Sequence, residues 1–221
     1  MPVKMNEREY RRILTDMEVR MGEDGGMYVE GYATTYNQPY TLVRDGEFRL
    51  DEQVDPAAFS ETDMSDVIMQ YDHEGRVFAR TKNGTLQLES DGHGLKVRAR
   101  LDGTDIGRQL YQEIAGGYTD KMSFGFTVAE DRKDRRKEDG VNVVLRTITK
   151  IGKLFDVSAV SLPANDATEI SARKIGDGLI AEAAEEIRAE EEREAQEAAE
   201  RERRSAALER LNKLIGGVRN E

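Results

Sequence analysis

Apolar residues alternate with small or polar residues between positions 121 and 128. The apolar set is Met122, Phe124, Phe126 and Val128, and the set between them is Lys121, Ser123, Gly125 and Thr127. A period of two is typical of a β-strand that turns one face toward a core. We therefore predict a half-buried strand whose outer face presents the hydroxyl of Ser123, with only a glycine two residues further on.

Short segments of the same kind recur along the chain, separated by turn signals. Further strands are predicted at residues 27–36, 67–73, 95–101, 141–151 and 154–162. Hairpin turns are predicted at Asp45-Gly46 and Asn83-Gly84, and a charged loop or hairpin tip at 131–140. Apolar spacings of three to four followed by Gly116-Gly117 predict one short helix, Ile106–Ala115. This pattern favours a mainly β domain, a barrel or a sandwich, with a few short helices.

The composition changes from about Ile175 onward. Residues 179–215 contain neither proline nor glycine and are rich in Ala, Glu and Arg, which favour helix. We predict a long charged C-terminal helix, solvated or weakly coiled-coil, attached through a hinge at Gly176–Gly178. Its late apolar residues are Leu208, Leu211, Leu214 and Ile215. The predicted organisation is a flexible N-terminal arm (1–26), a β-barrel domain (27–174) and a helical, acidic tail (175–221).

Charge and composition exclude several classes of protein. The chain has 221 residues, 35% of them charged, and a net charge of −11, which argues against a broad basic face for nucleic acid. The absence of cysteine excludes disulfides, thiolate metal sites and a cysteine nucleophile. No apolar run is long enough to cross a bilayer, and the polar start lacks the apolar core of a secretory signal. We expect a protein of the cytosol that needs no cofactor.

Two histidines are the candidate general bases. His73 ends a predicted strand and lies between Asp72 and Glu74, so it is either a surface histidine or a base. The side chains of those two acids diverge along a strand, which makes poor geometry for a metal site. His93, within Asp91–Gly94, is predicted to be a turn residue.

Asp156 lies in the middle of an apolar strand. A buried carboxylate needs a partner, because an unpaired one is costly. Two partners are open on this pattern: an imidazole that takes up a proton during catalysis, or an arginine of a neighbouring strand. Ser123, taken alone, is more simply explained as a surface residue of the strand, and a role as nucleophile depends on a base and an orienting acid elsewhere in the chain.

Four segments together resemble a known family. They are "YDHEGRVFART" around His73, "LESDGHGLKVRARLDGT", "KMSFGF" around Ser123 and "LFDVSAVSLPAN" around Asp156. In order and spacing they resemble the prohead (capsid maturation) proteases of tailed bacteriophages, which are related in fold to the herpesvirus assemblin proteases. The resemblance covers roughly residues 27–172.

The resemblance implies a serine endopeptidase on an assemblin-like β-barrel. By match of motif, Ser123 is the nucleophile, His73 the base and Asp156 the third member of a triad. Herpesvirus relatives have a second histidine in the third role. His93 precedes the serine and so does not match their order.

The same resemblance implies partners and a location. The substrates are the scaffold protein, N-terminal portions of the major capsid protein and the protease itself, inside the prohead in the cytoplasm of a bacterial host. The tail resembles a scaffolding segment, although a solubilising tail is the simpler alternative. Self-association is a further expectation; no nucleic acid or membrane partner is expected. The competing functions are an inactive capsid-assembly or scaffolding protein with the same fold, and a β-barrel binding module with an oligomerisation tail.

Overall fold

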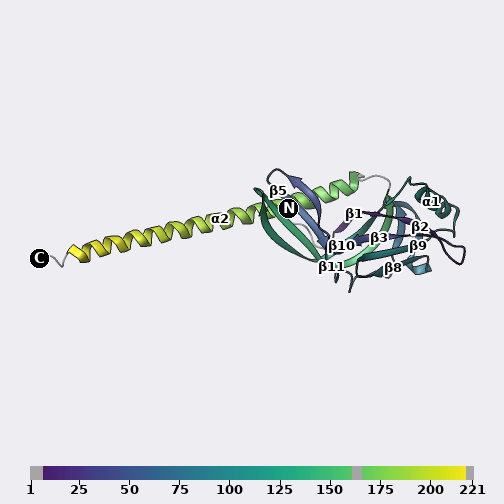
Figure 1. The fold of residues 1–221 in the computed structure, drawn as a ribbon, viewed down its shortest axis with the longest axis horizontal. Helices are drawn as coiled ribbons and strands as arrows, with labels where there is room; N and C mark the ends of the chain where they lie inside the picture. Colours follow the sequence, from purple (N-terminus) through teal and green to yellow (C-terminus); the bar gives the residue numbers. More distant parts are fainter. Residues whose placement is uncertain (1–6, 161–165, 218–221) are drawn as a thin grey trace. The chain divides into compact units, whose positions relative to one another are not determined.

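The computed structural model describes residues 7–160 and 166–217 and divides the chain into two compact units, Met1–Ile180 and Ala181–Glu221. The first unit contains the described strands (Figure 1). They are β1 (Arg8–Asp16), β2 (Glu18–Met21), β3 (Met27–Thr35), β4 (Tyr40–Asp45), β5 (Phe48–Val54), β6 (Ile68–Tyr71), β7 (Glu74–Arg80), β8 (Leu86–Ser90), β9 (Gly94–Arg100), β10 (Lys121–Glu138) and β11 (Val141–Val160). The helices are the 3₁₀ turn η1 (Thr81–Asn83), α1 (Asp105–Ala115) and α2 (Asp166–Gly217).

The long hairpin of β10 and β11 forms the centre of a curled seven-stranded sheet. Its strand order is β1-β10-β11-β5-β4, and β6 and β7 extend it from the C-terminal half of β11. Strands β5 and β6 run parallel to β11. Strand β10 is antiparallel to β11, and β1 is antiparallel to β10. The β10–β11 register shifts four times between Gly125 and Asp131. Such bulges bend a strand and increase its twist, which gives the sheet its half-barrel curl.

A second sheet, in the order β2-β3-β9-β8, completes the core. Apolar side chains of both sheets pack together, among them Val29, Val97 and Ala99 from the second sheet and Met122, Phe124 and Phe126 from the first. Helix α1 adds Leu110 and Ile114 to this core. The Thr104 hydroxyl accepts the amide hydrogen of Gly107 at 3.1 Å, which caps the start of the helix.

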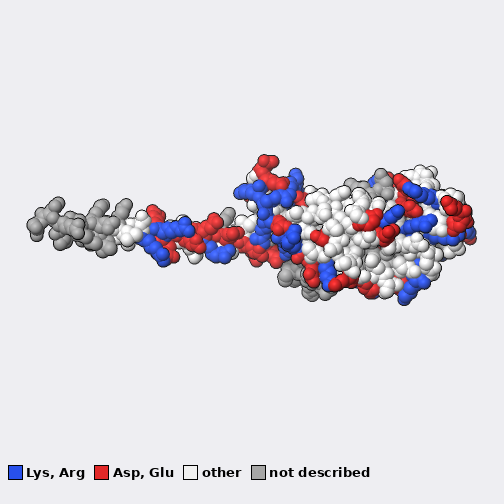
Figure 2. All heavy atoms as spheres, turned by 60° about the horizontal axis from the view of Figure 1, so that its bottom comes forward, with Lys and Arg blue, Asp and Glu red and all other residues white. Residues whose placement is uncertain are grey.

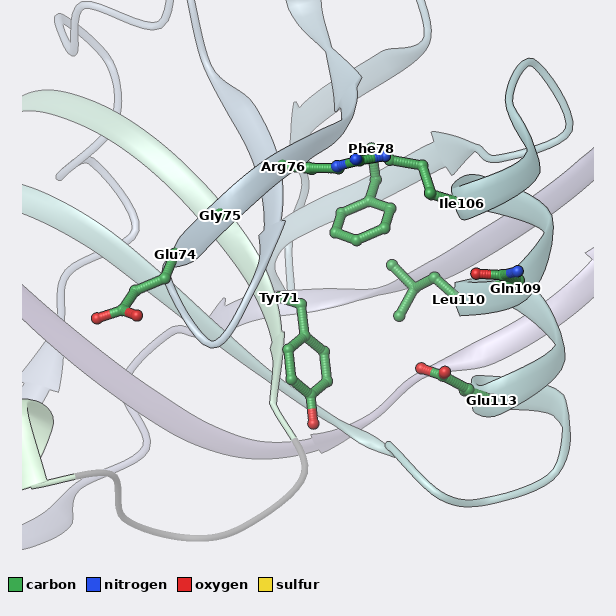
Figure 3. A pocket seen from close by; sticks show the side chains of 9 residues that line it. All are labelled: Tyr71, Glu74, Gly75, Arg76, Phe78, Ile106, Gln109, Leu110 and Glu113. Atoms are coloured by element: carbon green, nitrogen blue, oxygen red, sulfur yellow. The ribbon is translucent and has the colours of Figure 1, made fainter.

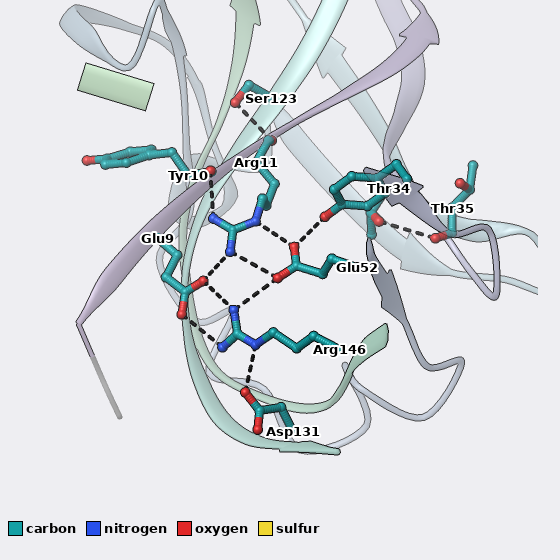
Figure 4. Close-up of polar contacts among 10 residues, drawn as sticks. Glu9, Tyr10, Arg11, Thr34, Thr35, Glu52, Ser123, Asp131 and Arg146 are labelled. Carbon is teal, nitrogen blue, oxygen red and sulfur yellow. Dashed lines mark hydrogen bonds and ion pairs between the residues drawn. The ribbon is translucent and has the colours of Figure 1, made fainter. Parts of the chain in front are cut away.

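A cluster of buried charges ties β1 to the rest of the sheet (Figure 4). Arg11 and Arg146 are at most 2% exposed, and Glu9 and Glu52 are at most 3% exposed. Arg11 Nε donates to Glu52 Oε1 at 2.5 Å, and Arg146 Nη1 donates to Glu52 Oε2 at 2.9 Å and to Glu9 Oε2 at 3.0 Å. Asp131 accepts from Arg146 Nε at 2.6 Å. Each charge therefore has an opposite charge beside it, as burial requires.

Burial on its own raises the pKa of Glu52. The charges of Arg11 and Arg146, and the hydrogen bonds from Arg11 and Tyr40, outweigh it and bring the pKa from 4.5 down to about 2. A carboxyl whose pKa is lower in the folded state stabilises the fold above its unfolded pKa. The contribution of Glu52 is therefore complete above about pH 4.5 and is lost as the pH falls toward 2.

Several predicted elements are confirmed. Residues 27–35 and 94–100 are strands, and helix α1 begins one residue before the predicted start and ends at Ala115. Gly117, with φ 73°, follows the helix in the left-handed region. Strands β4 and β5 form the hairpin predicted at Asp45-Gly46. The chain is thus mainly β with a few helices.

Other predictions need correction. Residues 8–21, predicted as part of a flexible arm, form β1 and β2, because the charges of β1 find buried partners far along the chain. Residues 131–138, predicted as a loop or tip, continue β10, and 141–160 form one strand instead of two. The Asn83-Gly84 turn joins β7 to β8 across the two sheets and is no hairpin, since each strand pairs elsewhere.

The second unit is part of the long helix α2. The helix runs through Gly176–Gly178 without a break, and the first unit extends to Ile180 instead of ending at 174. Figure 2 shows both acidic and basic side chains along the described part of the tail. Leu208 is 60% exposed, and the side chains of Leu211, Leu214 and Ile215 lie outside the described residues. Within residues 7–160 and 166–217, no helix is both long enough and apolar enough to span a membrane.

We predict that Arg146→Met destabilises the protein by about 3–5 kcal/mol, because Glu9 and Glu52 then remain buried beside one cation instead of two. Urea unfolding at pH 7, followed by circular dichroism, measures the difference.

The matched control is Arg20→Met. Arg20 pairs with Glu18 at the surface, where both side chains are more than 60% exposed, so the unfolding midpoint is expected to stay unchanged. Equal midpoints for the Arg146 and Arg20 variants would contradict the stabilising role of the cluster.

Candidate active site

Ser123 lies on β10 in the alternating segment, but both faces of that segment are buried. Its side chain is 1% exposed, whereas the sequence predicted an outer face with room beside the hydroxyl. The difference has a structural cause: His73 contacts the hydroxyl, and the ring of Tyr10 from β1 packs edge-on against the His73 ring, with centroids 4.5 Å apart. The space beside Ser123 is therefore filled by side chains of distant segments.

His73 occupies a tight turn instead of the end of a strand. Strands β6 and β7 pair through Tyr71 and Glu74, and the two residues between them have positive φ, 48° for Asp72 and 62° for His73. Two central residues with positive φ are typical of a type I′ hairpin turn. The amide of Asp72 donates to the carbonyl of Ala159 on β11 at 3.0 Å. This bond fixes the turn, and with it the imidazole, against the sheet.

Asp156 lies on β11, opposite Gly125 in the β10–β11 register, and is fully buried. The same pairing places Ser158 directly opposite Ser123. The two strands thus present Ser123 and Asp156 side by side on one face of the sheet, and the hairpin turn brings His73 over them.

The three predicted site residues come together in a single chain of hydrogen bonds. His73 Nε2 lies 2.6 Å from Ser123 Oγ, and His73 Nδ1 lies 2.6 Å from Asp156 Oδ1. An ionised carboxylate only accepts hydrogen bonds, so Nδ1 carries the proton and Nε2 presents a lone pair to the serine. This is the order in which an imidazole removes the proton of a hydroxyl nucleophile.

The carboxylate of Asp156 has two further donors. Ser158 Oγ donates to Oδ1 at 2.8 Å, and a guanidinium nitrogen of Arg8 donates to Oδ2. Burial raises the pKa of Asp156, but the bonds from His73 and Ser158 and the charges of His73 and Arg8 outweigh it, so the pKa lies below its ordinary value. Both partners left open by the sequence, an imidazole and an arginine, are present.

The backbone of β1 also contacts the serine. Ser123 Oγ lies 3.0 Å from the carbonyl oxygen of Arg11, the residue whose side chain enters the buried charge cluster (Figure 4). One hydroxyl hydrogen serves two acceptors, this carbonyl and Nε2 of His73. When the imidazole is protonated, the carbonyl remains as the acceptor. The serine is then held in place but is no longer deprotonated by its neighbour.

Four residues of the site were missed in the sequence analysis. They are Arg8, Tyr10, Gly125 in its structural role and Ser158. Ser158 had a signal, because it lies two residues from Asp156 on the same face of a strand. Arg8 and Tyr10 had none, since their segment is strongly charged and was assigned to a flexible arm. Their placement depends on pairing with β10, more than 100 residues away.

His93 is a turn residue, as predicted. Its amide donates to Asp91 Oδ1 at 2.7 Å, and its ring packs edge-on against Tyr32 with centroids 4.6 Å apart. Across the described residues, no group of three or more histidine or acidic side chains has the arrangement of a metal site.

A cavity of about 440 Å³ lies between the β6–β7 hairpin and helix α1 (Figure 3). Phe78 and Leu110 point toward each other across it, and Tyr71 enters from β6. Glu74, next to His73 in the chain, belongs to its lining, but His73, Ser123 and Asp156 do not. The cavity thus borders the hairpin that carries the imidazole without including the hydrogen-bonded chain.

The comparison with protein families agrees with the sequence resemblance. A family model described as caudovirus prohead serine protease matches residues 15–179. Among solved structures, the bacteriophage T4 capsid assembly protease is similar with a TM-score of 0.39 and 16% identity, over 70% of this chain and 99% of that chain. A similarity at that level carries no further argument. No curated protein sequence matches this chain.

We predict that Gly125→Ala destabilises the protein by about 1–3 kcal/mol. A Cβ at this position would lie 2.4 Å from Asp156 Oδ2 and 2.9 Å from Tyr10 Cε1. Alanine is ordinarily better than glycine within a strand, so a loss would report the crowded site and not the strand. Thermal and urea unfolding measure it.

Gly103→Ala is the control, because a Cβ there meets no atom within 4 Å. A Gly125→Ala variant at least as stable as Gly103→Ala would show that the contacts of Asp156 and Tyr10 at Gly125 are looser than described.

Proposed function

Because the chain belongs to the caudovirus prohead serine protease family, we propose that it is a serine endopeptidase with Ser123 as nucleophile, His73 as general base and Asp156 as the orienting acid. A single observation carries the assignment of residues. His73 is within 2.6 Å of both Ser123 Oγ and Asp156 Oδ1, through different ring nitrogens. No other described histidine contacts a serine hydroxyl backed by a buried acid.

The proposed reaction is acyl transfer to the serine. Ser123 Oγ attacks the carbonyl carbon of a peptide bond while its proton passes to His73 Nε2. Asp156 accepts a hydrogen bond from Nδ1 of His73 throughout the reaction. It stabilises the imidazolium by its charge and is not protonated itself. The imidazolium then gives its proton to the leaving amine. Water, deprotonated by the same imidazole, hydrolyses the acyl-enzyme and restores Ser123.

Access to the serine requires movement. With Ser123 1% exposed, a substrate carbonyl reaches Oγ only after covering side chains shift. The described state is therefore closed toward substrate, although its proton-transfer contacts are already made. Such a state suits a protease that must stay inactive until its substrates are assembled around it.

The proposed substrates follow from the family, whose description places its members in the prohead. They are the scaffold protein, N-terminal portions of the major capsid protein and the protease itself, cleaved inside the immature capsid in the host cytoplasm. We also propose that the curled sheet of the first unit is the assemblin-like barrel. The competing function is an inactive capsid-assembly protein with the same fold. It predicts no cleavage under any condition, whereas the hydrogen-bonded serine favours activity.

The second unit is proposed to be a scaffold-like tether. Residues 181–208 are dominated by exposed Ala, Glu and Arg, and two of their ion pairs, Arg201 with Glu197 and Arg204 with Glu200, join residues four apart on the helix. Such a helix supplies no group suited to catalysis, but it can bind a partner helix along its length. A solubilising tail remains the simpler alternative.

We predict that Ser123→Ala and His73→Ala each reduce cleavage of the co-expressed capsid protein by about 10⁴-fold or more, and that the double variant is no worse than either. Residues that act as one unit lose their combined effect when either is removed. Cleavage is followed by gel electrophoresis and by mass spectrometry of the products.

Two matched controls accompany these variants. His93→Ala removes the other histidine, and Ser60→Ala removes an exposed serine; both are expected to cleave at the wild-type rate. Losses that multiply in the double variant would show that His73 does not act through Ser123. Full cleavage by Ser123→Ala would overturn the proposed function.

We predict that a chain truncated after Ile180 cleaves the capsid protein normally but enters proheads less than the full chain does. The boundary is that of the first unit, which contains the whole hydrogen-bonded site. Cleavage of the capsid protein is measured with the active truncated chain. The amount of protease in purified proheads is measured by gel in a Ser123→Ala background, which prevents self-cleavage. Normal incorporation of the truncated chain would leave the solubilising tail as the explanation.

A further inference from the structure

Arg8 reaches the site from β1, outside the segment that the family model matches. Its guanidinium pairs with Asp156 Oδ2, the carboxylate oxygen that His73 does not use. The central carbon of this guanidinium, Cζ, lies 4.9 Å from the ring centroid of Tyr10 and 4.6 Å from that of Phe155. Arg8 is thus held by two aromatic rings and by the buried acid, although its side chain is 36% exposed.

Gly125 provides the space for this arrangement. A Cβ there would lie 2.4 Å from Asp156 Oδ2, 2.9 Å from Tyr10 Cε1 and 3.2 Å from Arg8 Nε. The three atoms that a side chain would displace are therefore those of the acid, the ring and the guanidinium. The glycine beside the nucleophile leaves room for Arg8.

The register of β1 is fixed from the opposite face. Glu9 and Arg11 alternate with Arg8 and Tyr10 along the strand, and both enter the buried charge cluster. A slip by one residue would turn these charges outward and move Arg8 away from Asp156. The cluster thereby keeps Arg8 in line with the carboxylate.

We propose that Arg8 is a positioning residue of the active site, which holds the Asp156 carboxylate ionised and in the plane that meets His73 Nδ1. The proposal rests on the proposed function, since it acts through Asp156 and His73. Arg8 forms an ion pair with Asp156 and has no described contact with the hydroxyl of Ser123. It completes the carboxylate's set of donors, with Oδ1 bound by His73 and Ser158 and Oδ2 bound by Arg8.

The charge of Arg8 has a measurable consequence. The Arg8 cation touches Asp156 and repels a further positive charge there, so its removal is expected to favour protonation of the hydrogen-bonded pair. Titratable or charged groups around the pair include Tyr10, which packs against the His73 ring, and the chain neighbours Asp72 and Glu74. Lys153 lies further out, beyond Phe155. Burial raises the pKa of Tyr10, which keeps it neutral on the acid side. Lys153 lies 5.6 Å from the Phe155 ring centroid and pairs with Asp63.

The test measures the rate at which a fluorophosphonate labels the full-length protein between pH 5 and 9. Serine Oγ attacks phosphorus, fluoride leaves, and the serine proton passes to the imidazole, so the rate reports the base without a known substrate. Arg8→Gln and Arg8→Met remove the charge, and the methionine keeps an apolar side chain between the two rings. Arg8→Lys restores the charge. Lys153→Gln removes a nearby cation that does not touch Asp156.

Both neutral variants are expected to move the acid limb of the profile to higher pH and to slow labelling there by about tenfold, with a smaller loss on the plateau. Arg8→Lys is expected to recover most of the wild-type position, and Lys153→Gln to match wild type. The proposal would be overturned if the acid limbs of the neutral variants coincided with that of wild type. It would also be overturned if the acid limb of Arg8→Lys were shifted as far as that of Arg8→Gln.

Stability is measured on the same samples by circular dichroism. Should one neutral variant not fold, the other and Arg8→Lys still decide the outcome, because the lysine must restore the limb. The proposed function fails in a different way: labelling would then persist in Ser123→Ala.

Discussion

The buried carboxylate of Asp156 is the constraint on which the site depends. A charge without solvent must find donors within the fold, because an unpaired buried carboxylate is strongly unfavourable. Asp156 is fully buried, and its donors come from three places: His73 in the β6–β7 turn, Ser158 on the same strand and Arg8 on β1. Satisfying one acid thus brings together segments that span most of the first unit. The imidazole is oriented as a consequence, with Nε2 directed at Ser123.

The same physics acts on the other face of β1. Glu9 and Arg11 are buried with Glu52 and Arg146, so this strand carries charges to both faces of the sheet. Such clusters contribute little net stability compared with apolar packing, but they penalise any arrangement that separates their members. Here the penalty specifies register. One network fixes β1 along β10, and the fixed strand then delivers Arg8 and the Arg11 carbonyl to the site.

Local pattern predicted the parts of the fold that local physics determines. The alternation at 121–128 identified the strand of Ser123, the lone acid in an apolar strand identified Asp156, and the motif order singled out His73; the structure brings these three together. The strained turn of His73 was not predicted, because positive φ at Asp72 and His73 lacks the usual glycine signal. Strand β1 was not predicted either: its charges are buried only because partners lie 41 and 137 residues away in sequence.

The protonation of one imidazole tests the central claim most directly. The chain has only two histidines, so ¹⁵N-labelled imidazoles give a spectrum in which His73 and His93 are readily assigned with the His93→Ala variant. The account predicts that neutral His73 carries its proton on Nδ1, with a strongly downfield hydrogen resonance that disappears in Asp156→Asn, and that Nε2 is unprotonated. A neutral His73 protonated on Nε2 could not take up the Ser123 proton and would contradict the account.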